Sequence, residues 1–162
     1  MTGWPQGLQA RSLSSGDAAT VAGWRYGGPW SVYDAAPPAD GIDSYTALVS
    51  PVDGELIGFF CVGEQARVPG LAADASYLDV GLGLAPDWVG RGYGAAFTHA
   101  VVGFVAAAHP GLRLRAVIQS WNRRALRAAQ RAGFTTAGTH FCVQHGRDVE
   151  YTVVVLASPA GG

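Results

Sequence analysis

The fold of this chain is decided by the stretch Pro86-Asp87-Trp88-Val89-Gly90-Arg91-Gly92-Tyr93-Gly94-Ala95, which joins an apolar strand to the start of a helix. Glycines at every second position let a ligand approach the main-chain amides without obstruction by Cβ atoms. Amides at a helix N-terminus, together with the positive end of the helix dipole, attract an anion. Arg91 can add a charge-assisted hydrogen bond to a phosphate. The stretch therefore predicts a phosphate-binding loop, and a tight turn without a ligand is the alternative interpretation.

This loop differs from the common nucleotide-binding motifs. It does not fit G-x-x-x-x-G-K-S/T, and the chain contains no lysine, so an ordinary P-loop NTPase is excluded. It also differs from G-x-G-x-x-G and lies in the middle of the chain, whereas a dinucleotide-binding loop follows a first strand.

The segments on either side of the loop predict a mixture of strands and helices. Before it we expect a strand over 8–13, a helix over 17–24 capped by Ser14 or Ser15, an irregular segment over 24–41, and strands over 45–50, 55–62 and 77–84. After it we expect a helix to about residue 108, a strand over 112–118, a helix over 123–132 capped by Asn122, and strands over 134–144 and 149–156. The pattern predicts an α/β (α+β) sheet in one domain at 1–157, with a disordered tail at 158–162.

The composition of the chain favours a globular protein and argues against nucleic-acid, metal and membrane partners. The chain has 162 residues, 49% of them apolar and 14% charged, which suits a packed globule. The formal charge of −1 argues against a nucleic-acid partner. Cys61 and Cys142 lack metal-ligand spacing, so we expect no metal. A secretory leader and a run of about 20 apolar residues are both missing from the sequence, which predicts a cytoplasmic protein with no membrane partner.

Two motifs resemble the GNAT superfamily of N-acetyltransferases. The first, R/Q-x-x-G-x-G/A, is met by Val89-Gly90-Arg91-Gly92-Tyr93-Gly94 except at Val89, where arginine or glutamine is usual. The second, N-x-x-A-I/L-x-x-Y-x-x-x-G-F, is met at Asn122, Ala125, Leu126, Gly133 and Phe134, while Ala129 stands at the tyrosine position.

The resemblance implies a single-domain GNAT fold, in which a mixed six- to seven-stranded sheet with splayed fourth and fifth strands is flanked by about four helices. It implies acetyl-CoA as co-substrate, with pantetheine beside the strand over 77–84 and pyrophosphate on the loop amides. The implied cofactor-binding positions are Leu82, Gly83, Leu84, Val89, Gly90, Arg91, Gly92, Tyr93, Gly94, Ala95, Asn122 and Ala125. For Asn122, a plain helix N-cap is an equal alternative.

The same resemblance implies a carboxylate base on the strand over 77–84, and Asp79 is the acid there. The alternative is that Asp79 faces the other side of the sheet and makes a structural hydrogen bond. Because Ala129 replaces the usual acid, the proton for the thiolate would come from Ser120, Tyr93 or Tyr151, or the thiolate would leave without one.

The acceptor end is expected in the aromatic N-terminal segment, with Trp24, Tyr26 and Tyr33 as candidate substrate-binding residues. The alternative is that these aromatic residues are core anchors. The sequence as a whole predicts acetyl transfer to a primary amine of a small molecule or a free amino group, by direct attack in a ternary complex. Two alternatives are an acyl-CoA-binding sensory module without turnover and a protein N-terminal acetyltransferase. A homodimer is among the expected assemblies.

Overall fold

The computed structural model describes residues 3–34 and 44–157, so the predicted tail at 158–162 and the end of the predicted irregular segment lie outside the described residues. The chain divides into two compact units. The first unit comprises Met1–Cys61 and Leu82–Tyr93, and the second comprises Val62–Gly81 and Gly94–Gly162.

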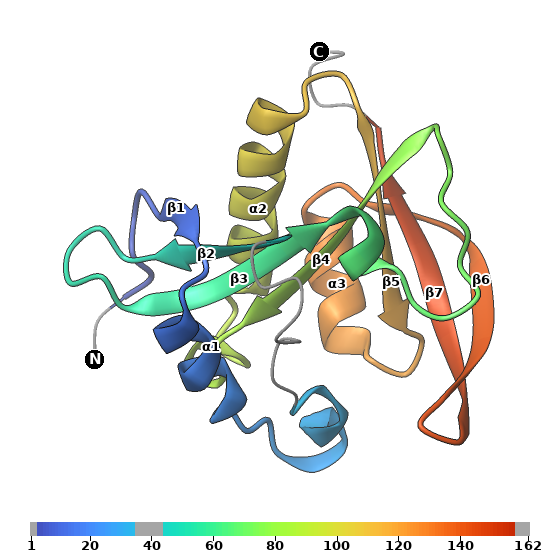
Figure 1. The fold of residues 1–162 in the computed structure, drawn as a ribbon, viewed down its shortest axis with the longest axis horizontal. Coiled ribbons are helices and arrows are strands. Elements are labelled where there is room, and N and C mark those ends of the chain that lie inside the picture. The colour runs from blue at the N-terminus through green and yellow to red at the C-terminus, as the bar shows by residue number, and fades with distance from the viewer. Residues whose placement is uncertain (1–2, 35–43, 158–162) are drawn as a thin grey trace. The chain divides into compact units, whose positions relative to one another are not determined.

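Seven strands follow the order β1-β2-β3-β4-β5-β7-β6 (Figure 1). They are β1 (Gln9–Ser12), β2 (Tyr45–Val49), β3 (Leu56–Val62), β4 (Tyr77–Leu84), β5 (Arg113–Gln119), β6 (Thr135–Gln144) and β7 (Arg147–Leu156). The β4–β5 pair is parallel, and the β1–β2, β2–β3, β5–β7 and β6–β7 pairs are antiparallel. The predicted mixed sheet is therefore confirmed.

The described helices are α1 (Ser15–Ala22), α2 (Gly94–Ala108) and α3 (Arg123–Arg131), with 3-10 helices η1 (Gly28–Tyr33), η3 (Gly63–Ala66) and η4 (Pro86–Trp88). On α2, Phe97, Val101 and Val105 repeat every four residues and are fully buried, so they form the face that packs into the core.

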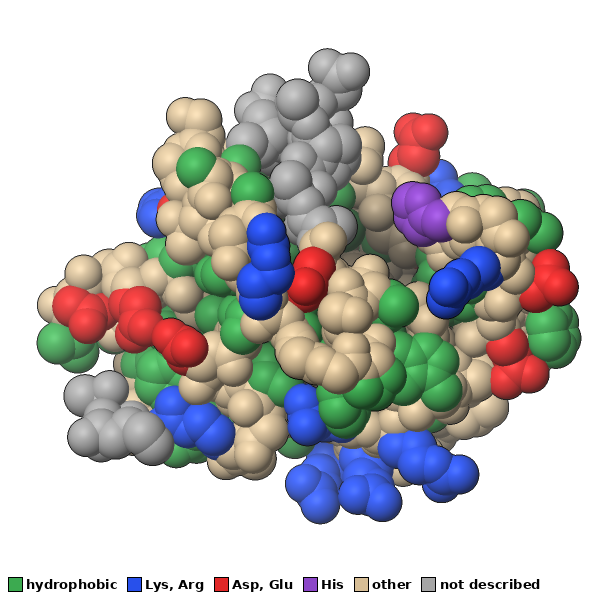
Figure 2. Space-filling view, turned by 90° about the horizontal axis from the view of Figure 1, so that it is seen from below, with side chains coloured by type: hydrophobic (Ala, Val, Ile, Leu, Met, Phe, Trp, Pro, Cys, Tyr) green, Lys and Arg blue, Asp and Glu red, His purple; other side chains and the backbone are tan. Residues whose placement is uncertain are grey.

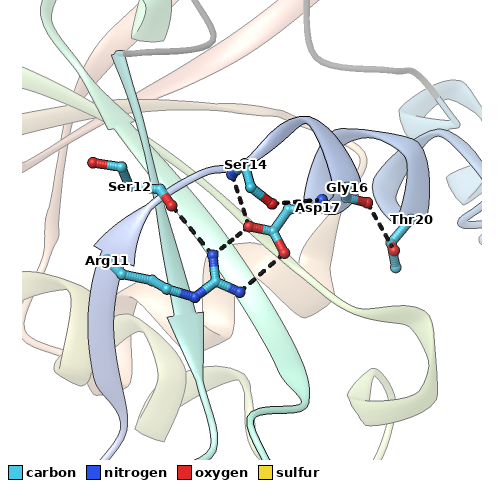
Figure 3. Close-up of polar contacts among 6 residues, drawn as sticks. All are labelled: Arg11, Ser12, Ser14, Gly16, Asp17 and Thr20. Atoms are coloured by element: carbon cyan, nitrogen blue, oxygen red, sulfur yellow. Dashed lines mark hydrogen bonds and ion pairs between the residues drawn. The ribbon is translucent and has the colours of Figure 1, made fainter.

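In the first unit, helix α1 begins at a capping box formed by Ser14 and Asp17 (Figure 3). Ser14 Oγ accepts from the Asp17 amide at 3.0 Å, and the Asp17 carboxylate accepts from the Ser14 amide at 2.8 Å. Arg11 on β1 donates to both carboxylate oxygens of Asp17, one of these bonds being 3.0 Å long. The box satisfies amide donors that the first turn of a helix leaves without partners.

Because of this cluster, the free energy of unfolding depends on the protonation of Asp17 and therefore on pH. The hydrogen bond from Arg11, together with those from Ser14, lowers the pKa of Asp17 from 3.8 to about 2. A carboxyl group with a lowered pKa stabilises the fold above its ordinary pKa and loses that contribution as pH falls from about 4 to about 2. Because the Arg11 side chain is 45% exposed, we expect a contribution of about 1–2 kcal/mol. Urea unfolding of the wild type and Asp17→Asn should show that difference at pH 6 and its loss at pH 2, and a constant difference would contradict it.

In the second unit, β6 and β7 form a long hairpin whose turn is shorter than the sequence predicts. The strands predicted over 134–144 and 149–156 leave residues 145–148 for the turn, but the ladder continues to the pair Gln144↔Arg147. His145 and Gly146 alone make the turn, with φ of 52° and 75°. Two consecutive positive φ values are what a two-residue hairpin turn of type I′ requires.

Strands β4 and β5 are registered over Tyr77–Asp79 and Arg113–Arg115. Strand β4 continues to Leu84 and β5 to Gln119, where β5 stays paired with β7. A parallel register at the beginning of two longer strands agrees with the splay that the sequence predicts.

Candidate functional site

The C-terminal end of β4 lies in the first unit and is held by Tyr26. The Tyr26 hydroxyl donates to the Leu84 carbonyl at 2.7 Å, and the following amide, of Ala85, donates to the Ile57 carbonyl at 2.9 Å. Burial, assisted by the nearby charge of Asp34, raises the pKa of Tyr26 to about 12. Tyr26 therefore stays a hydrogen-bond donor throughout the physiological pH range. Leu82, two residues earlier, keeps 41% of its surface exposed.

Gly83 is required by the packing beneath this end of the strand. A Cβ atom at position 83 would lie 2.6 Å from two carbons of the Phe59 ring. Trp24 stacks on Phe59, with the two ring centroids 6.0 Å apart and an interplanar angle of 24°. Of the three candidate acceptor residues, Tyr26 thus contacts β4, and Trp24 contacts the Phe59 ring beneath it. Tyr33 lies at the end of η1 with 36% of its surface exposed.

The glycine-rich loop follows η4 in the same unit. Gly90 and Gly92 have φ of 75° and 87°, in the region that favours glycine, and a Cβ at position 92 would meet nothing within 4 Å. The loop therefore presents open main chain at Gly92. The Arg91 guanidinium lies over the Trp88 ring at 4.7 Å and donates to the Asp87 carbonyl at 2.9 Å.

An aromatic cluster that no sequence motif predicts supports the loop. Tyr93 stacks on Trp4 with centroids 5.1 Å apart, and both rings meet Trp88 edge-on, at 5.6 Å and 5.5 Å. Trp88 is buried. The aromatic residues next to the glycines, Trp88 and Tyr93, were the available signal, but the contact of Trp88 with Trp4 across 84 positions cannot be derived from spacing.

In the second unit, the first residue of α2 packs against α3. A Cβ at Gly94 would lie 3.1 Å from the Cβ of Ala128, so the two helices meet closely at this point. Buried Asn122 caps α3 by accepting from the Ala125 amide at 3.1 Å. The N-cap role of Asn122 is confirmed, and the cofactor contacts of Asn122 and Ala125 stay predictions.

Asp79 lies in the second unit with only 3% of its surface exposed. One oxygen accepts from Arg115 Nε at 2.6 Å, and the other accepts from Arg115 at 3.0 Å and from Arg67 at 3.1 Å. Arg115 also donates to the Ala72 carbonyl at 2.8 Å. This is the structural hydrogen bonding that stood as the alternative to catalysis, and the base role stays a prediction. A carboxylate between Leu78 and Val80 was the signal that a cation had to lie nearby.

Ser120 and Tyr151, two of the candidates for the acid that would protonate the thiolate, both have hydrogen-bond partners within the protein. Ala129 is buried. Ser120 Oγ and Thr152 Oγ1 are 2.8 Å apart, and the Tyr151 hydroxyl donates to Gln144 at 2.5 Å. Burial raises the pKa of Tyr151.

No helix within residues 3–34 and 44–157 is long and apolar enough to cross a membrane. The same ranges contain no group of three or more His, Cys, Asp or Glu residues that could hold a metal ion.

Comparison with solved structures finds the same fold in several acetyltransferases. A GNAT-family acetyltransferase from Bacillus anthracis is 11% identical, with a TM-score of 0.66 over 95% of this chain and 96% of that one. A spermidine N-acetyltransferase SpeG chimera from Vibrio cholerae and hSSAT is 14% identical, with a TM-score of 0.64 over 93% and 95%. AAC(6')-Ib in complex with ribostamycin and coenzyme A is 19% identical, with a TM-score of 0.65 over 95% of each chain. At these identities the likeness shows the fold alone.

Sequence comparison supplies the family. No curated protein sequence matches the chain. The family model described as an acetyltransferase (GNAT) domain matches residues 14–135, which is most of the chain and includes both motifs. The chain therefore belongs to the GNAT family of acetyltransferases.

Proposed function

We propose that this protein transfers an acetyl group from acetyl-CoA to a primary amine of a small molecule, by direct attack in a ternary complex. The observation that carries the proposal is the loop leading into α2, where Gly90 and Gly92 have positive φ and nothing lies within 4 Å of the Cβ position of Gly92. Main chain open in this way, at a helix start, suits a pyrophosphate. Solved neighbours named for spermidine N-acetylation, and one in complex with ribostamycin and coenzyme A, support an amine acceptor and this co-substrate.

The proposal assigns the pantetheine contact on β4 chiefly to Leu82. The Leu84 carbonyl already accepts from Tyr26, whereas Leu82 is exposed. In this scheme Tyr26 and Phe59 are positioning residues, because they fix the strand end along which the thioester would lie.

Proton movement in the proposed reaction starts at the acceptor. The neutral amine attacks the thioester carbon, the new C–N bond forms, and the C–S bond breaks with the electron pair leaving on sulfur. The amine proton passes to a base. Since Ala129 cannot donate a proton and a thiol has an ordinary pKa near 8.5, the proposal lets the thiolate leave unprotonated.

Binding of acetyl-CoA is the first test. At a concentration 100 times the Kd, a ligand that binds only the native state adds about 2.7 kcal/mol, which for this chain length raises the Tm by about 5–10 °C. Gly92→Val should abolish that shift, because valine strains the backbone at a φ of 87° and blocks the approach to the main chain.

Gly111→Val is the matched control for this test. Gly111 also has a positive φ, 81°, and nothing within 4 Å of its Cβ position, but it follows the C-terminus of α2. That variant should lose similar stability and keep the acetyl-CoA shift. No shift in the wild type would overturn the proposal.

Turnover then separates the proposal from its alternatives. Release of free thiol with small primary amines supports it. Binding without turnover on any amine would favour the sensory module that Ala129 suggests, and turnover on peptide N-termini alone would favour protein acetylation.

A further inference from the structure

The aromatic cluster beside the glycine-rich loop joins two distant parts of the first unit. Trp4 comes from the segment before β1, whereas Trp88 and Tyr93 flank the loop residues 89–92, and all three belong to the first unit. The Trp4 ring stacks on Tyr93 with centroids 5.1 Å apart and an interplanar angle of 23°, and it meets Trp88 at 5.5 Å and 87°. One side chain from outside the loop therefore contacts the residues on both sides of the glycines.

The contacts of Trp4 distinguish it from an ordinary apolar side chain at a surface. Figure 2 shows hydrophobic side chains at several places on one face of the molecule. Single apolar side chains at a surface are normal and need no explanation. The half-buried Trp4 ring differs because it makes two aromatic contacts, each of which contributes more than the apolar area that it buries. Trp4 therefore holds the loop as well as covering apolar surface.

Side chains of the loop are occupied within the cluster, while the main chain at the glycines stays exposed. The Arg91 guanidinium carbon lies 4.7 Å from the Trp88 ring centroid and 5.4 Å from that of Tyr93. Trp88 is buried although its Nε1 donor has no hydrogen-bond partner among the described residues. A buried donor without a partner opposes folding, so packing and not hydrogen bonding sets the position of this ring. Between these side chains, Gly90 and Gly92 are exposed and have positive φ.

A glycine-rich loop that is held in this way binds a ligand at a lower cost. Glycine has the greatest backbone freedom of any residue, so ordering such a loop is unfavourable. A loop that becomes ordered only on binding pays this cost out of the affinity, whereas a preorganised loop does not. If only a fraction of the molecules has the competent loop, the apparent Kd rises by the inverse of that fraction.

We propose that Trp4 is a positioning residue for the co-substrate. By holding Trp88 and Tyr93, it keeps the main chain at Gly90 and Gly92 in the conformation that accepts the pyrophosphate before acetyl-CoA binds. Trp4 acts through these two rings and needs no contact with the ligand. The inference rests on the proposed function and adds to it a residue that lies outside both sequence motifs.

The first test measures acetyl-CoA binding by calorimetry in the wild type, Trp4→Leu and Trp4→Phe. Leucine keeps apolar bulk but loses the two ring contacts, each equivalent to a factor of about 2–10 in an equilibrium constant. The Kd of Trp4→Leu should therefore rise about tenfold. Phenylalanine retains a ring that stacks on Tyr93, so the Kd of Trp4→Phe should stay within about threefold of the wild-type value.

Trypsin cleavage after Arg91 reports the order of the loop directly. Cleavage of a folded protein follows the population in which the cleaved segment is open. Without ligand, cleavage at this bond, followed by mass spectrometry, should be about tenfold faster in Trp4→Leu than in the wild type or Trp4→Phe. Saturating acetyl-CoA should suppress the cleavage in all three proteins, because it binds the ordered loop.

Asp17→Asn is the matched control, because it destabilises the first unit at the start of α1. It should retain the wild-type Kd and the wild-type cleavage rate after Arg91. An unchanged Kd in Trp4→Leu, no recovery in Trp4→Phe, unaltered cleavage after Arg91, or an equal effect of Asp17→Asn would each overturn the inference and leave the proposed function standing. A wild type that binds no acetyl-CoA would overturn both.

Discussion

Replacing Asp79 by asparagine is expected to lower the free energy of unfolding by about 3–5 kcal/mol. The carboxylate is buried and joins Arg115 and Arg67, and Arg115 is itself buried. The variant leaves that guanidinium without its counter-charge, which costs more than the ion pair contributes by itself. Urea unfolding followed by circular dichroism measures the loss.

Asp53→Asn is the control for this result, because Asp53 is exposed in the β2–β3 turn and its hydrogen bond to the Glu55 amide can be made by asparagine. We expect it to change stability by less than about 0.5 kcal/mol. A similarly small effect of Asp79→Asn would contradict the importance of the buried pair.

The same variant decides whether Asp79 also moves protons. Loss of a general base lowers kcat by about 10²–10⁴ in the folded protein. Since both carboxylate oxygens are bonded to guanidinium groups, we expect a loss of less than about tenfold once the unfolded fraction is subtracted. The larger loss, with a changed pH profile, would identify Asp79 as the base.

Replacing Gly83 by alanine is the second change with a large expected effect. The new Cβ would lie 2.6 Å from the Phe59 ring, which is held by Trp24 and Tyr45. Overpacking of this kind costs about 1–3 kcal/mol. Thermal and urea unfolding should both report the loss, and Gly83→Ala/Phe59→Leu should recover part of it because leucine vacates the ring position.

Gly103→Ala provides the opposite control. Gly103 lies on the exposed side of α2 with nothing within 4 Å of its Cβ position. There alanine should stabilise the protein by about 0.5–1 kcal/mol, because it reduces the freedom of the unfolded chain. Equal behaviour of the two glycine variants would show that Phe59 yields without cost.

Local chemistry explains which parts of the fold could be predicted. The bounds of β4 follow from an apolar run ended by Pro86, and the start of α3 follows from Asn122 as a cap. These elements are set by neighbours in the sequence. The two-residue turn at His145 could not be predicted because positive φ is uncommon for any residue other than glycine, and only the register of β6 with β7 requires it there.

The hydrogen-bond partners of Asp79 and Leu84 could not be predicted, because they come from distant positions in the sequence. The side chains that hold Asp79 come from 12 and 36 residues away, and Tyr26 reaches Leu84 across 58. Periodicity shows that Asp79 is buried among apolar neighbours, but it does not reveal which of eleven arginines pairs with it. The motif identified the cofactor loop, whereas the aromatic side chains supporting it belong to no motif.

The position of β7 between β5 and β6 also affects how the protein is made. When a ribosome has completed β5, the strand that will pair with it has not yet been translated. At about 5–20 residues per second, the interval from Gln119 to Leu156 lasts roughly 2–7 s. During that time the nascent chain presents an unpaired apolar edge from Leu114 to Ile118, open to pairing with other chains. A chain truncated before Arg147 would keep that edge permanently, so we expect such fragments to aggregate and the last ten-residue strand to be indispensable for soluble expression.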